Sequence, residues 1–260
     1  MKILFIGDIV GKPGRAIVAQ LLPDLRKELT VDMVIANVEN IAHGKGLTQK
    51  TWDELRRAGV DAGTGGNHTF SKDDARVLYA DEQQPLVRPA NAYPSEPGKG
   101  VKTITTTKGK VRLMNFMGQS FMNDEPSSPF TAADTLLAET NVPVTVVDVH
   151  AETTSEKVAM GWHLDGRVSA VLGTHTHVPT ADARILPGGT AYVTDVGMCG
   201  QRDGIIGVDR AAIMPRFLNG EKKTHDIIEH GPAVFNAVLM EFDDSGKATS
   251  ISRIDREVVV

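Results

Sequence analysis

The chain has 260 residues, of which 41% are hydrophobic and 23% charged, a composition typical of a globular protein with a sizeable core. Its formal net charge is −5, whereas nucleic-acid clamps usually carry a basic excess, so we expect no stable nucleic-acid clamp. The single cysteine, Cys199, excludes an intramolecular disulfide and a thiolate zinc site.

The N-terminal segment MKILFIGDIVGKPGR has only a short apolar run before Asp8. This pattern fits neither a signal peptide nor a membrane span. We therefore expect a soluble, cytoplasmic protein with no membrane partner.

The first part of the chain alternates apolar strands with amphipathic helices. The hydrophobic spacing predicts strands over 2–7, 32–37 and 61–64 and helices over 14–29, 48–58 and 71–80. This alternation predicts a mostly parallel sheet with helices packed against it. In such sheets, ligands gather at the carboxyl ends of the strands.

The rest of the chain is less regular. We predict an excursion over 85–100, a loop over 118–130, a helix over 153–164, and strands over 111–116, 143–149 and 168–172. Segments 233–242 and 248–254 flank the turn sequence DDSG, which predicts an antiparallel hairpin. Because no repeat or linker is evident, we expect a single domain over 1–260, with two packed sheets.

Polar side chains follow five of the predicted strands. These strand ends supply eight oxygen or imidazole donors: Asp8; Glu39 and Asn40; Asn67 and His68; His150; His175 and His177. Such donors suit Mn²⁺, Fe or Zn²⁺. A carboxylate such as Glu39 can bridge two ions, with a position left for water.

Taken singly, most of these residues have ordinary structural explanations: helix cap (Asp8), turn residue (Glu39, Asn40, Asn67) or buried hydrogen-bonded histidine (His150). His175 and His177 carry a stronger signal, because residues i and i+2 of an extended segment point to the same side. The joint occurrence of ligand types at five strand ends favours a metal centre.

Two motifs, GNH at 66–68 and GTHTH at 173–177, resemble the G-N-H…G-x-H-x-H signature of metallophosphoesterases. The sequence departs from that pattern at Val10, where a histidine is usual, at Glu39, where a bridging aspartate is usual, and at Thr69, where an acid is usual. These departures are themselves recognisable. The segments GDIVGKPGR, NVENIAHGKGLT, GGNHTF, VDVHAETTSEK, GTHTHVPTAD and TDVGMCG resemble the YmdB-like branch of the superfamily, from Gly7 to Gly200.

The resemblance implies an α/β fold, a two-sheet αββα sandwich of the metallophosphoesterase type with mixed sheets. It also implies a dinuclear, metal-dependent phosphodiesterase that hydrolyses small cyclic nucleotides, first 2′,3′-cyclic ones and second 3′,5′-cAMP. A homo-oligomer is expected. The cofactors would be two divalent or trivalent ions, Fe or Mn ahead of Zn.

Carried over residue by residue, the resemblance assigns one ion to Asp8, Glu39, Asn40 and His177, and the second to Glu39, Asn67, His150 and His175. Asn40 would fill the place of the histidine missing at Val10. A metal-bridging hydroxide would attack phosphorus, and His68 would act as general acid toward the departing ribose oxygen.

Other interpretations stay open from the sequence alone. The same centre suits a phosphomonoesterase or nucleotidase, or a regulatory protein that binds metal and nucleotide. His68 could instead orient a metal ligand. Asp182 and Asp195 could each orient a ligand histidine or make ordinary structural hydrogen bonds.

Several remaining residues are expected to have lesser roles. His163, His225 and His230 are expected at the surface or around the ligands, and His43 likewise unless its loop reaches the metal centre. Pro13 after Lys12 excludes a nucleotide-triphosphate P-loop. Cys199 is expected to be a small buried thiol, not a nucleophile.

Overall fold

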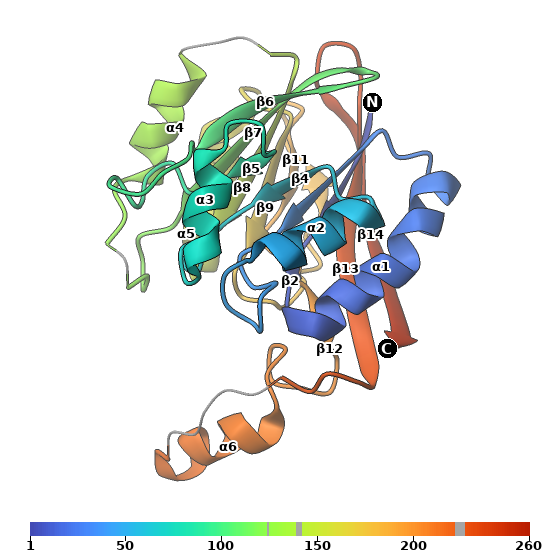
Figure 1. Ribbon diagram of the computed structural model, residues 1–260. Helices are drawn as coiled ribbons and strands as arrows, with labels where there is room; N and C mark the ends of the chain where they lie inside the picture. Colours follow the sequence, from blue (N-terminus) through green and yellow to red (C-terminus); the bar gives the residue numbers. More distant parts are fainter. Residues whose placement is uncertain (124, 139–141, 222–226) are drawn as a thin grey trace.

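The computed structural model describes residues 1–123, 125–138, 142–221 and 227–260. Its strands form two mixed sheets that lie face to face, with helices on the outer side of each (Figure 1). The αββα sandwich expected from the sequence is therefore confirmed. His225 lies outside the described residues.

The first sheet has the order β2-β12-β13-β1-β3-β4-β5, with β14 paired to the other side of β13. Strands β1, β3 and β4 run parallel, as predicted, and β5, within the predicted excursion, extends this parallel set, whereas β13 is antiparallel to β1, β12 and β14. The strands are β1 (Lys2–Ile6), β2 (Asp8–Ile9), β3 (Met33–Asn37), β4 (Ala62–Thr64), β5 (Leu86–Val87), β12 (Met198–Gln201), β13 (Pro232–Phe242) and β14 (Ala248–Val259).

The second sheet has the order β10-β11-β9-β8-β7-β6. Its central strands β7, β8, β9 and β11 are parallel, and the edge strands β6 and β10 are antiparallel to their neighbours. The strands are β6 (Val101–Thr106), β7 (Gly109–Met117), β8 (Val144–His150), β9 (Ala170–Thr174), β10 (Arg184–Ile185) and β11 (Ala191–Val193).

The helices lie on the two outer faces, except the last, which stands away from both sheets (Figure 1). They are α1 (Gly11–Glu28), α2 (Gln49–Ala58), α3 (Asp73–Ala80), α4 (Pro129–Leu137), α5 (Thr154–Leu164) and α6 (Arg210–Asn219). Within the described ranges, none of these helices combines the length and the apolar content needed to span a membrane.

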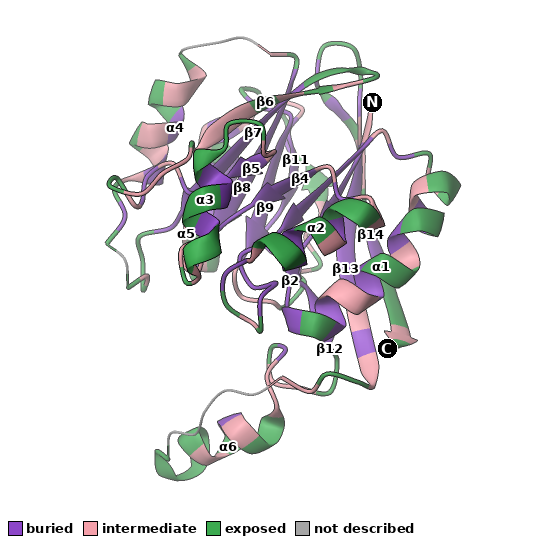
Figure 2. Ribbon diagram, in the orientation of Figure 1, coloured by how far each residue is buried: buried purple, intermediate pink, exposed green. Residues whose placement is uncertain are grey.

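Successive side chains of a strand point to opposite faces of its sheet, and the buried apolar side chains accordingly form three layers. In β1, Ile3 and Phe5 pack between the two sheets, while Leu4 and Ile6 pack under α1 and α2. A third cluster lies between the second sheet and helices α4 and α5. The central strands are accordingly buried on both faces, and the helices bury one side each (Figure 2).

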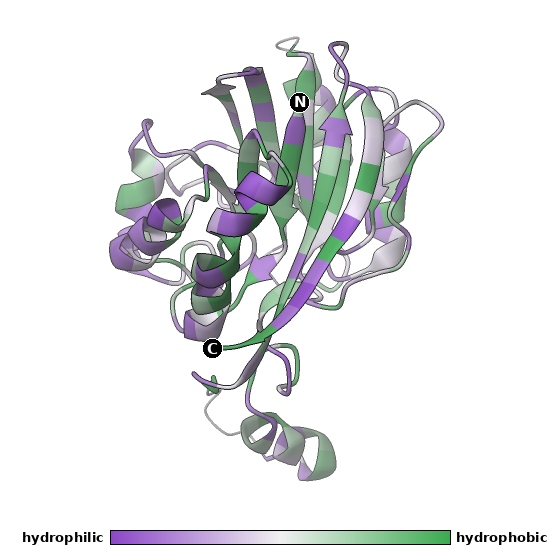
Figure 3. Cartoon of the chain, turned by 90° about the vertical axis from the view of Figure 1, so that its right-hand side faces the viewer, coloured by the Kyte–Doolittle hydropathy of each residue, from purple (hydrophilic) through white to green (hydrophobic). Residues whose placement is uncertain are grey.

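The predicted late hairpin is confirmed as β13 and β14, which pair from Pro232↔Val259 to Phe242↔Ala248. Asp243 Oδ1 closes the turn by accepting hydrogen bonds from the main-chain nitrogens of Ser245 and Lys247. Strand β14 mixes hydrophilic and hydrophobic residues along its length, as an edge strand does (Figure 3).

Eight elements were not predicted from the sequence: β2, β5, β6, α4, β10, β11, β12 and α6. The short strands β10, β11 and β12 have two to four residues, too few to establish a period of two. Strand β6 (VKTITT) lies at a sheet edge and carries polar residues along both faces. Pairing with β7 therefore decides its conformation.

Candidate metal centre

The carboxyl ends of the central strands meet at one end of the sandwich. Parallel register brings Asn37 of β3 beside Thr64 of β4, and His150 of β8 beside Thr174 of β9. Strands β2 and β8 carry Asp8 and His150, and loops at this end carry the other polar residues singled out in the sequence. The first sheet supplies Asp8, Glu39, Asn40, Asn67 and His68, and the second supplies His150, His175 and His177.

Glu39 lies at the centre of this group and is 1% exposed. Its Oε1 is 3.3 Å from His150 Nε2 and 3.2 Å from His68 Nδ1, and it accepts a hydrogen bond from Asn40 Nδ2 at 3.0 Å. Its Oε2 accepts a hydrogen bond from the main-chain nitrogen of His68 at 2.9 Å. One carboxylate thus contacts residues from both sheets.

His150, Asn67 and His175 form one half of the site. His150 Nε2 lies 3.0 Å from Asn67 Oδ1 and 3.0 Å from His175 Nδ1. One ligand atom each from Glu39, His150 and His175 can be chosen so that all lie within 4.8 Å of one another. Donor atoms that converge in this way fit the first shell of a transition-metal ion.

Asp8, His177 and Asn40 form the other half. Asp8 is fully buried, and among the described residues its Oδ1 has no hydrogen-bond partner. That oxygen lies 3.8 Å from His177 Nε2, which in turn is 3.3 Å from Asn40 Nδ2. An unpaired buried carboxylate oxygen is costly, and a cation would satisfy it. The residues present therefore fit metal ions.

Gly66 allows the two sheets to approach so closely. A Cβ atom at this position would collide with Glu39 Oε2 and with His150 Nε2. The glycine of the GNH motif is therefore required by the space between two candidate ligands.

The two histidines of the GTHTH motif do not lie on an extended segment, and that part of the sequence reasoning was wrong. Strand β9 ends at Thr174, and His175 and His177 have φ angles of 98° and 64°. Left-handed conformations at non-glycine residues cost of order 1–3 kcal/mol each and mark sites where surrounding contacts fix the backbone. The chain turns at these residues and brings both rings to the centre.

Hydrogen bonds beyond the candidate ligands select histidine tautomers. Thr174 Oγ1 donates to Asp148 Oδ1 at 2.7 Å, so it accepts from His150 Nδ1 at 2.9 Å. His177 Nδ1 donates to the carbonyl oxygen of Ile206 at 2.9 Å. Both arrangements leave Nε2 as the atom directed at the centre.

The electrostatic environment couples the buried groups. Burial alone would raise the pKa of Glu39, but contacts with His150 and His68 outweigh it and hold that pKa well below its usual value. Burial alone would lower the pKa of His150, but the carboxylates of Glu39 and Asp8 outweigh it and raise that pKa to about 9. Burial lowers the pKa of His175 to about 3. The buried carboxylate of Glu39 thus favours positive charge on the groups that it contacts, and a bound cation would supply such a charge.

His68 lies beside the candidate ligands and is partly exposed. Its Nδ1 is 3.0 Å from Asn40 Oδ1, and its Nε2 is 3.4 Å from Asn67 Nδ2. Its side chain is 28% exposed, so it can be reached from solvent. This position suits both a proton donor and a group that orients Asn40 and Glu39.

The other three histidines that the structure describes lie outside this group. His43 is exposed, His163 pairs with Asp134 at 2.9 Å, and His230 is exposed. Cys199 is fully buried, and burial raises its pKa far above the usual range, so it remains a neutral thiol, as expected from the sequence.

Asp182 and Asp195 accept hydrogen bonds from different residues. Asp195 Oδ2 accepts hydrogen bonds from the main-chain nitrogen and hydroxyl of Thr176, between the two histidines. Asp182 accepts from Thr180 and Thr194 instead. Neither carboxylate has a direct hydrogen bond to a candidate ligand histidine.

Sequence reasoning missed several residues around the centre: Asn37, Asp148, Glu152, Thr174 and Ile206. Asp148 carried a usable signal, since it is an acidic residue inside the β-branched run PVTVVDV, two positions before His150. Glu152 Oε2, 3.1 Å from His175 Nε2, follows the same strand. Ile206 contributes only its carbonyl oxygen, for which no side-chain pattern exists.

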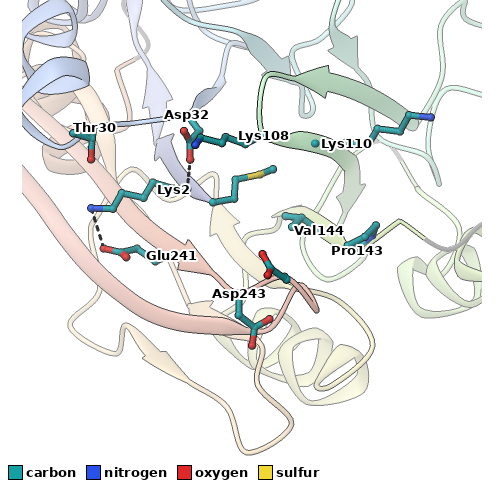
Figure 4. Close-up of a pocket in the computed structure, with 12 residues that line it drawn as sticks. Lys2, Thr30, Asp32, Lys108, Lys110, Pro143, Val144, Glu241 and Asp243 are labelled. Atoms are coloured by element: carbon teal, nitrogen blue, oxygen red, sulfur yellow. Dashed lines mark hydrogen bonds and ion pairs between the residues drawn. The ribbon is translucent and has the colours of Figure 1, made fainter.

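A separate cavity of about 650 Å³ lies at the opposite end of the strands, around Lys2 and Asp32 (Figure 4). Its lining mixes lysines and carboxylates, and Lys2 is paired with Glu241 at 3.4 Å. None of the candidate ligands lines this cavity. The convergent donors at the carboxyl ends, not this cavity, form the candidate metal centre.

Comparison with known proteins decides the family. The model of the YmdB-like protein family matches residues 4–254. The chain belongs to the YmdB-like family. The 2′,3′-cyclic-nucleotide 2′-phosphodiesterase of Bacillus subtilis strain 168 is a similar member, 46% identical over 98% of this chain and 96% of its own length.

Two solved structures are similar to this chain in fold. The crystal structure of a novel phosphatase from Mycoplasma pneumoniae matches with a TM-score of 0.92 and 38% identity, covering 100% of this chain and 93% of the other. The NAD nucleotidase of Haemophilus influenzae matches with a TM-score of 0.61 at 12% identity, covering 100% of this chain and 56% of the other. The latter likeness shows the fold alone.

Proposed function

We propose that this YmdB-like protein is a metal-dependent phosphodiesterase that hydrolyses cyclic nucleotides, 2′,3′-cyclic nucleotides first and 3′,5′-cAMP second. The convergence of Glu39, His150 and His175 ligand atoms within 4.8 Å carries this proposal. The relative from Bacillus subtilis, named a 2′,3′-cyclic-nucleotide 2′-phosphodiesterase, supports the substrate class. We propose that residues 1–260 act as one domain.

In this proposal Glu39 is shared by two ions. Asp8, Asn40 and His177 complete one ligand set, and Asn67, His150 and His175 complete the other. All the donors are oxygen or imidazole nitrogen, which suit Fe, Mn and Zn alike, and the YmdB-like resemblance places Fe or Mn ahead of Zn. Bound ions of this kind lower the pKa of water and offset the negative charge of phosphate.

The protein residues then have separate tasks. Thr174 and the carbonyl of Ile206 hold the His150 and His177 rings with Nε2 toward the centre. The neutral amide of Asn67 adds a ligand without adding negative charge near the phosphate. His68 would donate a proton to the departing ribose oxygen, which is a poor leaving group unless protonated.

Metal analysis and a substrate panel test this proposal. Freshly purified protein should contain Fe or Mn, and Mn²⁺ or Fe²⁺ should restore hydrolysis of 2′,3′-cyclic nucleotides after chelation. Glu39→Gln should lose both metal affinity and hydrolytic activity. Each should fall by more than the roughly 10–100-fold that is typical when only an orienting partner of a ligand is removed. The control Glu241→Gln, at the opposite end of the strands, should retain both. Absence of bound metal and of metal-stimulated hydrolysis would contradict the proposal.

A phosphomonoesterase or nucleotidase is the second candidate, favoured by the name of the Mycoplasma pneumoniae relative, a novel phosphatase. Faster hydrolysis of nucleoside monophosphates than of 2′,3′-cyclic or 3′,5′-cyclic nucleotides, at equal metal loading, would favour it. If the protein is instead a regulator that binds metal and nucleotide, the Glu39→Gln variant should lose hydrolysis but keep its cellular function.

We also propose that the protein acts in the cytoplasm as a homo-oligomer. Helix α6 stands away from the sheets (Figure 1), and its Phe217 and Leu218 are 75% and 76% exposed. Exposed apolar side chains on one short helix favour burial against another chain. Light scattering coupled to size-exclusion chromatography should report more than one copy per particle, and a monomeric mass would contradict this part.

A further inference from the structure

A lysine and an aspartate form an ion pair inside the protein, next to the turn that carries His175 and His177. Lys157 of α5 and Asp195, just after β11, have side chains that are each 1% exposed, and Lys157 Nζ lies 2.6 Å from Asp195 Oδ2. Apolar side chains of similar size frequently stabilise a protein as well as a buried ion pair does. General stability is therefore a weak reason for this pair.

Asp195 contacts the residue between the two histidines. Its Oδ2 accepts hydrogen bonds from the Thr176 main-chain nitrogen at 3.2 Å and from Thr176 Oγ1 at 2.7 Å, in addition to the lysine. Its Oδ1 accepts from the main-chain nitrogen of Gly197 at 2.8 Å. Bonds to an ionised carboxylate are stronger than neutral ones, so Asp195 fixes Thr176 on both its backbone and its side chain.

Lys157 packs against the strand end that leads into the same turn. A Cβ atom at Gly173 would lie 2.7 Å from Lys157 Cδ, so the lysine stem runs against the end of β9, two residues before His175. Its ammonium group balances the charge of Asp195, and both side chains are buried. The positive φ angles of His175 and His177 persist only where neighbouring contacts fix the backbone in this way.

Asp182 provides an internal comparison. It accepts hydrogen bonds from Thr180 Oγ1 at 2.7 Å and from Thr194 Oγ1 at 2.6 Å. It therefore anchors the segment that follows the histidines to β11 and its flank, but it makes no hydrogen bond to Thr176. Loss of Asp182 should therefore loosen this segment while the bonds between Asp195 and Thr176 remain.

We propose that the Lys157–Asp195 pair is a positioning device for the metal centre, which acts through Thr176 to hold His175 and His177 in their ligand positions. This inference rests on the proposed function, in which the two histidines belong to different ions. Release of Thr176 should therefore weaken the binding of both ions, not of one alone.

Metal binding, not hydrolysis, tests this inference. Wild type, Asp195→Asn, Thr176→Val and Asp182→Asn are stripped of metal and titrated with Mn²⁺ and, separately, with Co²⁺. Calorimetry gives the affinity and stoichiometry, and visible absorption of bound Co²⁺ reports the ligand geometry. Circular dichroism and thermal unfolding show that each variant is folded.

Asp195→Asn should weaken binding of both ions by about 10–100-fold and change the Co²⁺ spectrum, as loss of an orienting partner does. Thr176→Val, which keeps the ion pair and side-chain shape, should weaken binding by a smaller factor. Asp182→Asn should bind like wild type even where its unfolding temperature falls. If Asp195→Asn does not fold, the Thr176→Val titration decides.

Wild-type affinity and spectrum in Asp195→Asn or, where that variant does not fold, in Thr176→Val would overturn the inference and leave the proposed function intact. Equal weakening in Asp182→Asn would also overturn it, because general loosening would then explain the loss. Wild-type protein that binds neither ion would contradict both the inference and the proposed function.

Discussion

The hydroxyl oxygen of Thr174 lies 2.9 Å from Nδ1 of His150, and both side chains are fully buried. Because the same hydroxyl donates to Asp148, it can only accept from the histidine. A short side chain from β9 thus sets which nitrogen of a β8 histidine is directed at the candidate metal centre. This relationship, not the identity of His150 alone, makes the ring suitable as a ligand.

Replacing Thr174 with valine should test that relationship. Thr174→Val keeps the shape but leaves the His150 Nδ1–H and the Asp148 carboxylate each short of a partner, at a cost of about 1–3 kcal/mol in unfolding free energy. Metal affinity should fall roughly 10–100-fold. Isothermal titration with Mn²⁺ and chemical denaturation measure the two effects.

Thr145→Val is the matched control, since Thr145 is a buried threonine of β8 that lies toward the opposite end of the strand. It should leave metal affinity unchanged. Unchanged metal affinity in Thr174→Val would show that the hydroxyl does not orient His150.

His68→Ala should separate proton donation from ligand orientation. If His68 protonates the ribose oxygen, the variant should lose about 10²–10⁴-fold in kcat on a 2′,3′-cyclic nucleotide. It should lose little on bis(p-nitrophenyl) phosphate, because p-nitrophenolate leaves without a proton. Steady-state kinetics on both substrates, at measured metal content, gives the comparison.

If His68 only orients a metal ligand, the His68→Ala variant should show a different pattern of rates. A group that only orients Asn40 or Glu39 would lower metal content and reduce hydrolysis of both substrates alike. Equal losses on the two substrates would therefore exclude the acid role. His163→Ala, whose histidine pairs with Asp134 away from the centre, should change neither rate.

Gly66→Ala should abolish metal binding without unfolding the protein. The added methyl group collides with the carboxylate of Glu39 and the imidazole of His150, and it must displace at least one of them. We expect less than one ion per chain by elemental analysis, with a native circular dichroism spectrum. Gly220→Ala, where an added Cβ meets nothing within 4 Å, should keep its metal although its φ of 77° costs about 1 kcal/mol. Normal metal content in Gly66→Ala would show that the two sheets can separate at this point.

Asp182 should make stability depend on pH in the acidic range. Burial alone would raise the pKa of Asp182, but hydrogen bonds from Thr180 and Thr194 outweigh it and lower that pKa. A carboxyl whose pKa is lower in the folded than in the unfolded protein stabilises the fold above its unfolded pKa. This contribution is lost as the pH falls through the folded value.

The measurement is the difference in unfolding free energy between wild type and Asp182→Asn, taken from denaturant titrations across acidic to neutral pH. Wild type should be the more stable near neutral pH, and the difference should shrink as the solution becomes acidic. A difference that does not change with pH would show that the charge of Asp182 contributes nothing.

Much of the fold followed from the sequence because its signals are local. The apolar runs that became β1, β3, β8 and β9 and the helix patterns of α1, α2 and α5 need only a short window of chain. Strand β6 was missed because pairing with its neighbour β7 decides its conformation, and β12 was missed because its partners β2 and β13 are distant in sequence.

By itself, the sequence determined the α/β class, the family and the set of candidate ligands, because residue type and position after a strand are properties of a short segment. Only the tertiary structure decided how those ligands are held. In the structure, Asp195 accepts a hydrogen bond from Thr176, whereas Asp182 accepts one from Thr180. The carbonyl oxygen of Ile206 accepts a hydrogen bond from His177, and two residues of the GTHTH motif have left-handed backbone conformations. These features depend on contacts between segments far apart in the chain, and no local pattern encodes them.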